Sequence, residues 1–151
     1  MKRILFTIIL ISAALVSMAQ VRVTTPNLEL VLKAKKGGEL QVQHFGGRLS
    51  DADLANLSAA GVPNHNAYPP YGFWCPSEAS LTVTHADGNM STVLKVEGVS
   101  QEEEDGAQVT RIRLKDTVYP FNVTGCYRAY QDVDMIETGT EIENLEKKPR
   151  C

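Results

Sequence analysis

Hydrophobic and polar residues alternate with a period of two along most of this chain. The clearest run is at the leucines of "LELVL", where Leu28, Leu30 and Leu32 are two positions apart. Successive side chains of a β-strand point to opposite faces, so this spacing predicts a half-buried strand. The same period recurs in five later segments: 81–84, 92–96, 109–115, 121–129 and 136–142.

The segments between these runs carry turn and cap signals. Residues 35–38, "KKGG", predict a hairpin turn between the first leucine run and a strand at 40–44. Ser50 precedes residues 51–57 as a candidate helix cap, and 58–77 are rich in Gly, Pro, Asn and Tyr and predict a long loop. Residues 101–106, "QEEEDG", predict a solvated charged turn. Seven or eight short strands with hairpin-like links predict an all-β fold, an antiparallel β-sandwich.

The first nineteen residues have the three parts of a secretory signal peptide. Lys2 and Arg3 are followed by an apolar run from Ile4 to Val16 and by small residues before Gln20. The 13 residues from 4 to 16 are fewer than the roughly 20 needed to span a bilayer, which disfavours a membrane anchor. We therefore expect cleavage after residue 19, a mature domain at 20–151 with no membrane attachment, and a secreted or periplasmic location.

The size and the charge of the chain disfavour two classes of protein, nucleic-acid-binding proteins and (β/α)₈ barrels. Removing 19 residues from a chain of 151 leaves 132, and the formal charge falls from −3 because two cations leave with the signal. An acidic chain without a basic stripe argues against nucleic acid as a partner. The length is also below the roughly 250 residues of a (β/α)₈ barrel, and nothing in the sequence indicates a cofactor.

Three cysteines remain in a chain that we expect to be exported: Cys75, Cys126 and Cys151. A Cys75–Cys126 disulfide is compatible with export, but the spacing does not establish it. No CxxC or HxxxH pair is present, which disfavours a metal site. Cys151 is the last residue, and this position leads us to expect that a natural domain continues beyond it.

Residues 84–89, "THADGN", place a histidine and a carboxylate close together. The Asp87-Gly88 pair between two β runs predicts a turn, with His85 and Asp87 exposed. A His–Asp pair that activates a nucleophile is the alternative, but no Ser or Cys here has an elbow motif. We therefore interpret the segment as a turn.

The order of several segments resembles the amino-terminal domain of family 36 glycoside hydrolases, the secreted α-galactosidases of the Bacteroides type. The matching segments are "TPNLELVLK" (25–33), "AYPPYG" (67–72), "ASLTVTHADGN" (79–89), "RLKDTVYPFNVTGCYRAY" (113–130) and "DMIETGTEIENLEKKP" (134–149). The resemblance covers nearly all of the mature chain.

The resemblance implies a β-supersandwich that precedes a catalytic (β/α)₈ barrel. It implies a retaining hydrolase that removes terminal α-linked galactose from galacto-oligosaccharides, with both catalytic aspartates on the barrel. No part of this chain corresponds to that barrel, so we expect this polypeptide to be non-catalytic, with α-galactosides bound through the missing catalytic domain. The sequence leaves undecided whether the full-length enzyme is a homo-oligomer. The alternative is a stand-alone sandwich that binds carbohydrate or protein.

The resemblance also points to one loop. Many family members carry a pattern like YGxGDFREPA, and the matching stretch here runs from Tyr71 to Ser80. Glu78 keeps the pattern, whereas Cys75 stands at its acid and Ser77 at its arginine. Trp74 and Glu78 are therefore the candidate substrate contacts. A Trp also buries a large area, so a packing role under the loop is the alternative for Trp74.

Overall fold

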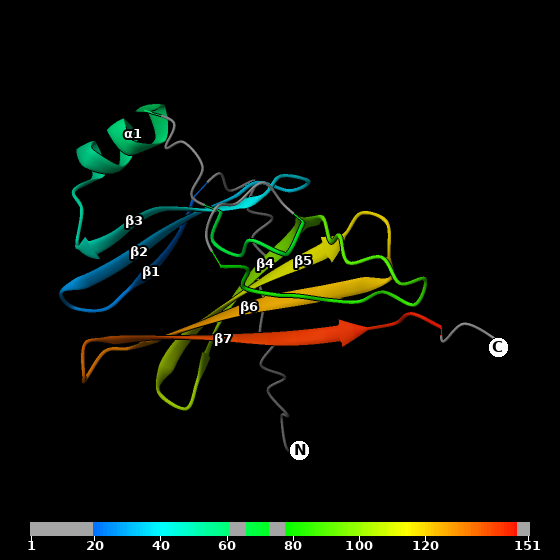
Figure 1. Ribbon diagram of the computed structural model, residues 1–151. Helices are drawn as coiled ribbons and strands as arrows, with labels where there is room; N and C mark the ends of the chain where they lie inside the picture. Colours follow the sequence, from blue (N-terminus) through cyan, green and yellow to red (C-terminus); the bar gives the residue numbers. More distant parts are fainter. Residues whose placement is uncertain (1–19, 61–65, 73–77, 148–151) are drawn as a thin grey trace, which may run out of the picture.

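A computed structural model describes residues 20–60, 66–72 and 78–147. Within these residues the chain forms seven strands and one helix (Figure 1). In chain order they are β1 (Val21–Thr24), β2 (Leu28–Ala34), β3 (Leu40–Gly47), α1 (Asp51–Ala60), β4 (Leu94–Glu104), β5 (Ala107–Asp116), β6 (Phe121–Tyr130) and β7 (Met135–Asn144). The predicted signal peptide at 1–19 lies outside the described residues, and no described helix has the length and apolarity needed to cross a membrane.

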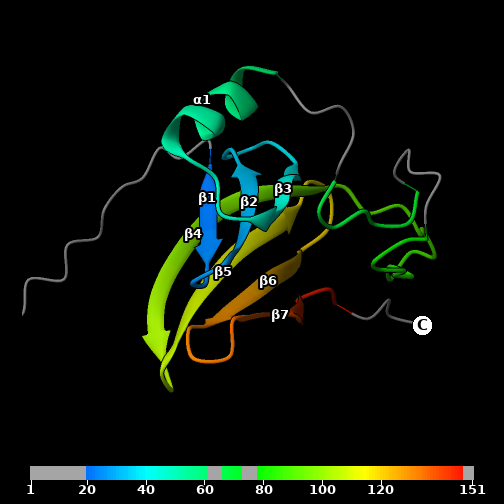
Figure 2. The ribbon, with the colours of Figure 1, turned by 90° about the vertical axis from the view of Figure 1, so that its left-hand side faces the viewer.

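The strands form two antiparallel sheets, as the sequence predicted. One sheet has the order β1-β2-β3 and the other β4-β5-β6-β7, so every pairing joins neighbours in the sequence. Figures 1 and 2 show the sheets as two layers, with α1 on the side of the three-stranded sheet away from the four-stranded one. The fold is a β-sandwich.

The core lies between the two layers and is built from the alternating residues. On the three-stranded sheet it includes Val23 and Leu32, and on the four-stranded sheet Ile112, Phe121 and Val123, each at most 2% exposed. The predicted inward face of β6 is therefore confirmed. The apolar area that these side chains remove from water is the main favourable contribution to folding.

The predicted extent of two segments, 101–106 and 81–84, was wrong. Residues 101–104 do not form a turn, because β4 continues to Glu104 and only Asp105 and Gly106 reverse the chain. Both turn residues have positive φ, 48° and 77°, as a two-residue hairpin turn requires. The glutamates fit a strand because they lie on the surface, where Arg111 pairs with Glu102 and Glu104.

Residues 81–84 also differ from the prediction. Leu81 forms a single parallel bridge with Pro70, and the segment from 82 to 85 has no ladder. Leu81 and Val83 still pack against the core, so the alternation correctly indicated which side chains turn inward. Strand β1 was not predicted, because "VRVT" is short and directly follows the apolar leader.

The predicted hairpin and helix are both present. Gly37 takes a φ of 75° in the turn between β2 and β3, and the turn also bonds to β4 through the Val96 carbonyl at 2.8 Å. At the start of α1, the Ser50 hydroxyl accepts a hydrogen bond from the Asp53 amide at 3.2 Å, which confirms the cap. The helix extends three residues further than predicted, to Ala60.

Candidate functional site

The "THADGN" segment forms a tight turn, as predicted. The Asn89 carbonyl accepts a bond from the His85 amide at 2.8 Å, and Gly88 has a φ of 87°. Asp87 supports the turn through its Oδ1, which accepts a bond from the Asn89 amide at 2.9 Å. Asp87 is exposed, as expected for a turn residue.

The expectation that His85 is exposed was wrong, since only 3% of the residue is accessible. Its imidazole stacks on the ring of Tyr119, with centroids 3.6 Å apart and planes at 8°, and meets the edge of Phe121. Its Nδ1 lies 2.7 Å from Oε1 of Glu146, and its Nε2 lies 3.2 Å from Oγ1 of Thr92. The histidine thus joins the turn to the segment that follows β7.

This acid–imidazole–hydroxyl order is that of a hydrolytic triad. The hydroxyl, however, belongs to Thr92, which is 2% exposed, and it lies beside an equally buried ring. A nucleophile must reach the substrate carbon, and Thr92 is closed off from it. We therefore assign the His85 cluster a structural role, in which Glu146 also accepts the Ala86 amide at 2.8 Å.

The structure does not pair Asp87 with His85. Oδ2 of Asp87 accepts the Tyr119 hydroxyl at 2.8 Å, and the same phenol oxygen accepts the Asn89 side-chain amide at 2.8 Å. The bond from Asn89 alone would lower the pKa of Tyr119, but the Asp87 carboxylate and burial together outweigh it and raise that pKa. The pKa of Asp87 is lowered, first by the Asn89 amide and then by the Tyr119 hydroxyl.

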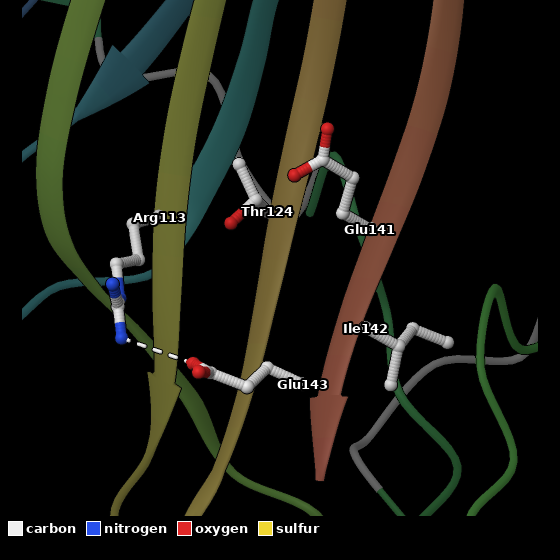
Figure 3. A pocket seen from close by; sticks show the side chains of 5 residues that line it. All are labelled: Arg113, Thr124, Glu141, Ile142 and Glu143. Atoms are coloured by element: carbon white, nitrogen blue, oxygen red, sulfur yellow. Dashed lines mark hydrogen bonds and ion pairs between the residues drawn. The ribbon is translucent and has the colours of Figure 1, made fainter.

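One pair of carboxylates lines a hollow on the outer face of the four-stranded sheet. The hollow has a volume of about 330 Å³ and is lined by Arg113, Thr124, Glu141, Ile142 and Glu143 (Figure 3). Glu143 bonds to Arg113 at 3.2 Å and to Asn122 at 2.7 Å, whereas the Glu141 carboxylate points the other way along the sheet.

A retaining glycosidase needs two carboxyl groups about 5–5.5 Å apart that face the same sugar carbon. Glu141 and Glu143 diverge, and Glu143 is already neutralised by Arg113. This hollow therefore has no acid–nucleophile pair. The described residues also contain no group of three His, Cys, Asp or Glu side chains arranged to hold a metal ion.

The loop residues chosen from the sequence are only partly visible. Trp74 lies in the stretch 73–77, outside the described residues, as do Cys75 and Ser77. Glu78 is exposed, so its role as a substrate contact stays a prediction. The Tyr71 amide bonds to the Leu81 carbonyl at 2.9 Å, which ties this loop to the segment before the turn.

Cys126 is a free, buried thiol, so the disulfide suggested for it with Cys75 is not formed. Its sulfur lies 3.5 Å from Oε1 of Glu141 on the outer face of the four-stranded sheet. Burial raises the pKa of the Cys126 thiol, and the Glu141 carboxylate raises it further. The thiol is thereby kept protonated and unreactive.

Sequence reasoning missed the His85 cluster because its members are far apart in the chain. Glu146 lies 61 residues after His85, and no local pattern links the two. The one available signal was the period of the flanking segment, which places His85 in phase with the inward-facing Leu81 and Val83.

Residues 38–150 match the family model described as "Glycosyl hydrolase family 36 N-terminal domain". No curated protein matches the chain. Among solved structures, an α-galactosidase from Lactobacillus brevis matches 85% of the chain with a TM-score of 0.69 and 16% identity. A variant of the family 36 α-galactosidase AgaA from Geobacillus stearothermophilus, solved with raffinose, matches 83% with a TM-score of 0.67 and 19% identity.

The galactosidase domain of the α-galactosidase-sucrose kinase AgaSK matches 86% of the chain, with a TM-score of 0.70 and 18% identity. At these identities the structural likeness shows a shared fold. In each of the three comparisons this chain spans 22% of the length of the matched chain.

Proposed function

Because the chain belongs to the N-terminal domain family of family 36 glycosyl hydrolases, we propose that it forms the non-catalytic N-terminal part of a secreted α-galactosidase. The observation that carries this proposal is the family match over residues 38–150. The α-galactosidases that share its fold support it, since they are more than four times longer than the matched segment. The reaction is the removal of terminal α-linked galactose from galacto-oligosaccharides.

In this proposal the sandwich supplies a scaffold, and the acids that break the bond lie elsewhere in a longer polypeptide. The diverging Glu141 and Glu143 agree with this division of roles. Retention of configuration requires a nucleophile and an acid/base on opposite sides of one sugar. A barrel of about 250 residues is the expected carrier of that pair.

Two measurements test the proposal. The codons downstream of Cys151 are expected to encode a barrel with two carboxylates at its substrate face, and the longer polypeptide is expected to release nitrophenol from a nitrophenyl α-galactoside. The chain of 151 residues is expected to release none under the same conditions. Hydrolysis by this chain alone would refute the non-catalytic assignment. An inactive longer polypeptide would refute the proposal that the complete protein is an α-galactosidase.

We also propose that Trp74 and Glu78 contact substrate. Glu78 is exposed and therefore free to accept hydrogen bonds from sugar hydroxyls. Trp74 is the single tryptophan of the chain of 151 residues, and comparison with Trp74→Phe isolates its signal in the longer polypeptide. There, raffinose is expected to change tryptophan fluorescence more in the wild type than in Trp74→Phe, and Glu78→Gln is expected to raise KM more than it lowers kcat. Equal responses of the wild type and Trp74→Phe at millimolar raffinose would remove Trp74 from the site.

Export is the remaining part of the proposal, and it rests on the sequence of residues 1–19. Cleavage is expected to leave Gln20 as the first residue of the mature protein. N-terminal sequencing of the protein from the periplasm or medium checks this expectation. Recovery of the uncleaved chain in the cytoplasm would contradict it.

A further inference from the structure

One long sheet edge has no partner among the described residues. Strand β7 pairs with β6 along its full length from Met135 to Asn144, and no other described strand pairs with it. Its outer edge therefore presents a row of backbone N–H and C=O groups to solvent. Proteins normally shorten, cover or pair such an edge.

An open groove lies directly beside this edge, between the two sheets. Its volume is about 570 Å³, and its walls come from β2 and β3 of one sheet and from β6 and β7 of the other. The lining residues are Leu30, Leu32, Val42, Phe45, Ala67, Tyr68, Ser80, Gly125, Tyr127, Ile136, Thr138, Gly139 and Thr140. The groove is thus a part of the sandwich core that the described residues leave uncovered.

Exposed apolar side chains mark the same side of the molecule. Phe45 on β3, which lines the groove, is 65% exposed, and Ile142 on β7 is 54% exposed although it lies in phase with the half-buried Ile136 of that strand. A β-strand added to β7 would lie about 4.7–4.9 Å from it and place every second side chain over the groove. Such a strand satisfies the free backbone groups and covers Phe45 and Ile142 at once.

A small polar ligand fits this groove poorly. Ligand pockets combine apolar walls with several convergent polar groups. Here the polar side-chain atoms of the lining are a few hydroxyls, such as those of Ser80 and Thr138, and the lining has no charged residue. A ladder of backbone groups next to an apolar groove is instead the arrangement used for strand addition.

The charges on β7 define the chemistry of the added strand. The outer face of β7 carries Glu137, Glu141 and Glu143. Among the described ion pairs, only Glu143 has a cation partner, Arg113 at 3.2 Å. Opposite-charge pairs across neighbouring strands are stabilising, so residues opposite Glu137 and Glu141 are expected to be Lys or Arg.

The same charges disfavour a second copy of this chain as the occupant. Antiparallel pairing of two β7 strands centred on Gly139 sets Glu137 of one copy opposite Glu141 of the other. Like charges placed directly opposite each other are destabilising. The edge therefore favours a basic strand over self-association.

We propose that the β7 edge and its groove are the docking site of one further β-strand, in which apolar residues alternate with Lys or Arg. The strand belongs to the same longer polypeptide, and this choice of source rests on the proposed function. The matched α-galactosidase chains, of which this unit is 22%, have ample length to supply it. A strand within one polypeptide also has a high effective concentration at the edge.

The test uses the full chain and three fluorescein-labelled ten-residue peptides. The first alternates valine with lysine, the second alternates valine with glutamate, and the third has the valines and lysines of the first in two blocks. Fluorescence anisotropy is expected to show at least tenfold tighter binding of the alternating lysine peptide than of either other peptide. Equal binding of the three peptides would overturn the proposal.

A matched pair of variants separates docking from general attraction of a basic peptide to an acidic protein. Glu141→Lys changes the charge on β7, and Glu103→Lys makes the same change on β4, at the opposite edge of the sheet. Glu141→Lys is expected to weaken binding at least fivefold, with far-ultraviolet circular dichroism unchanged, and Glu103→Lys by less than twofold. Equal losses would overturn the proposal, as would a dimer whose β7 amides become protected from hydrogen exchange.

The two proposals fail in different ways. Peptides that do not dock, together with an active longer α-galactosidase, overturn the docking site and leave the function intact. Docking of the alternating lysine peptide together with an inactive longer polypeptide refutes the α-galactosidase and with it the assigned source of the strand.

Discussion

Replacement of Arg22 by methionine tests the buried charge pair of the three-stranded sheet. The Glu29 residue is 0% exposed, and its carboxylate bonds to the Arg22 guanidinium and, at 2.8 Å, to the Leu49 amide. Burial alone would raise the pKa of Glu29, but the bonds from Arg22 and from the Leu49 amide outweigh it and lower that pKa. Arg22→Met keeps most of the aliphatic stem and leaves the carboxylate with one donor.

The expected loss is large for a single substitution. Breaking a buried ion pair by removing one partner costs about 3–5 kcal/mol. The Arg22 side chain is 35% exposed and the Leu49 amide remains, so we expect a loss around the lower end of this range and partly below it, about 2–4 kcal/mol. With a urea dependence of about 1–3 kcal/mol/M, the unfolding midpoint should fall by roughly 1–2 M.

The assay is urea unfolding of the full chain, followed by far-ultraviolet circular dichroism at pH 7. The matched control is Arg113→Met, because Arg113 pairs with Glu97 and Glu143 while all three side chains are 42–53% exposed. Exposed pairs contribute about 0–1 kcal/mol, so the control midpoint should move little. Equal shifts for the two variants would refute the argument that burial of Glu29 decides the effect.

Acidification gives a second check on the same pair. The pKa of Glu29 is lower in the folded protein than its ordinary value of 4.5, so its stabilising effect is complete above about pH 4.5. That effect is lost as the pH falls through the lowered pKa. The difference between wild type and Arg22→Met should therefore shrink below pH 4.5, and a difference that stays constant to pH 2 would contradict the assignment.

Three further substitutions probe local features of the fold. Ser50→Ala removes the cap of α1 and should lower the stability of the helix by about 1 kcal/mol. This loss should appear as faster amide hydrogen exchange in the first turn of the helix. Gly106→Ala places a Cβ at a φ of 77° and should cost about 1–2 kcal/mol in urea unfolding, with no change for Gly98→Ala beyond about 0.5 kcal/mol. Asp134→Asn weakens bonds that the carboxylate accepts from Thr25 and Asn27; because these bonds lower the pKa of Asp134, the destabilisation should be present at pH 7 and vanish as the pH falls below 3.8.

The sandwich was predictable because strands such as β5 alternate buried and exposed residues. In β5, Ile112 and Leu114 are buried while Arg113 and Lys115 are exposed, which is the alternation read from the sequence. The same spacing misled at 81–84, where Leu81 and Val83 face inward without a ladder partner. Alternation indicates which side chains are buried, and it does not report whether a neighbouring strand is present.

The role of His85 was not predictable from its neighbours in the chain. Local residues indicated a turn, and the turn is there, but the burial of the ring depends on Tyr119, Phe121 and Glu146. These contacts arise only when the start of β6 and the segment that follows β7 have folded against the turn. A short His–Asp spacing therefore says little about chemistry when the decisive partners are 34 to 61 residues away.

Strand β7 carries the most informative difference between sequence and structure. Ile136, Thr138, Thr140 and Ile142 alternate as if one face were buried, yet Ile142 is 54% exposed and the face borders the open groove. The pattern of a strand reflects its surroundings in the complete protein, including neighbours outside the described residues. An alternation that the described residues leave uncovered agrees with the proposed docking of a further strand, and the acidic outer face of β7 favours basic residues in that strand.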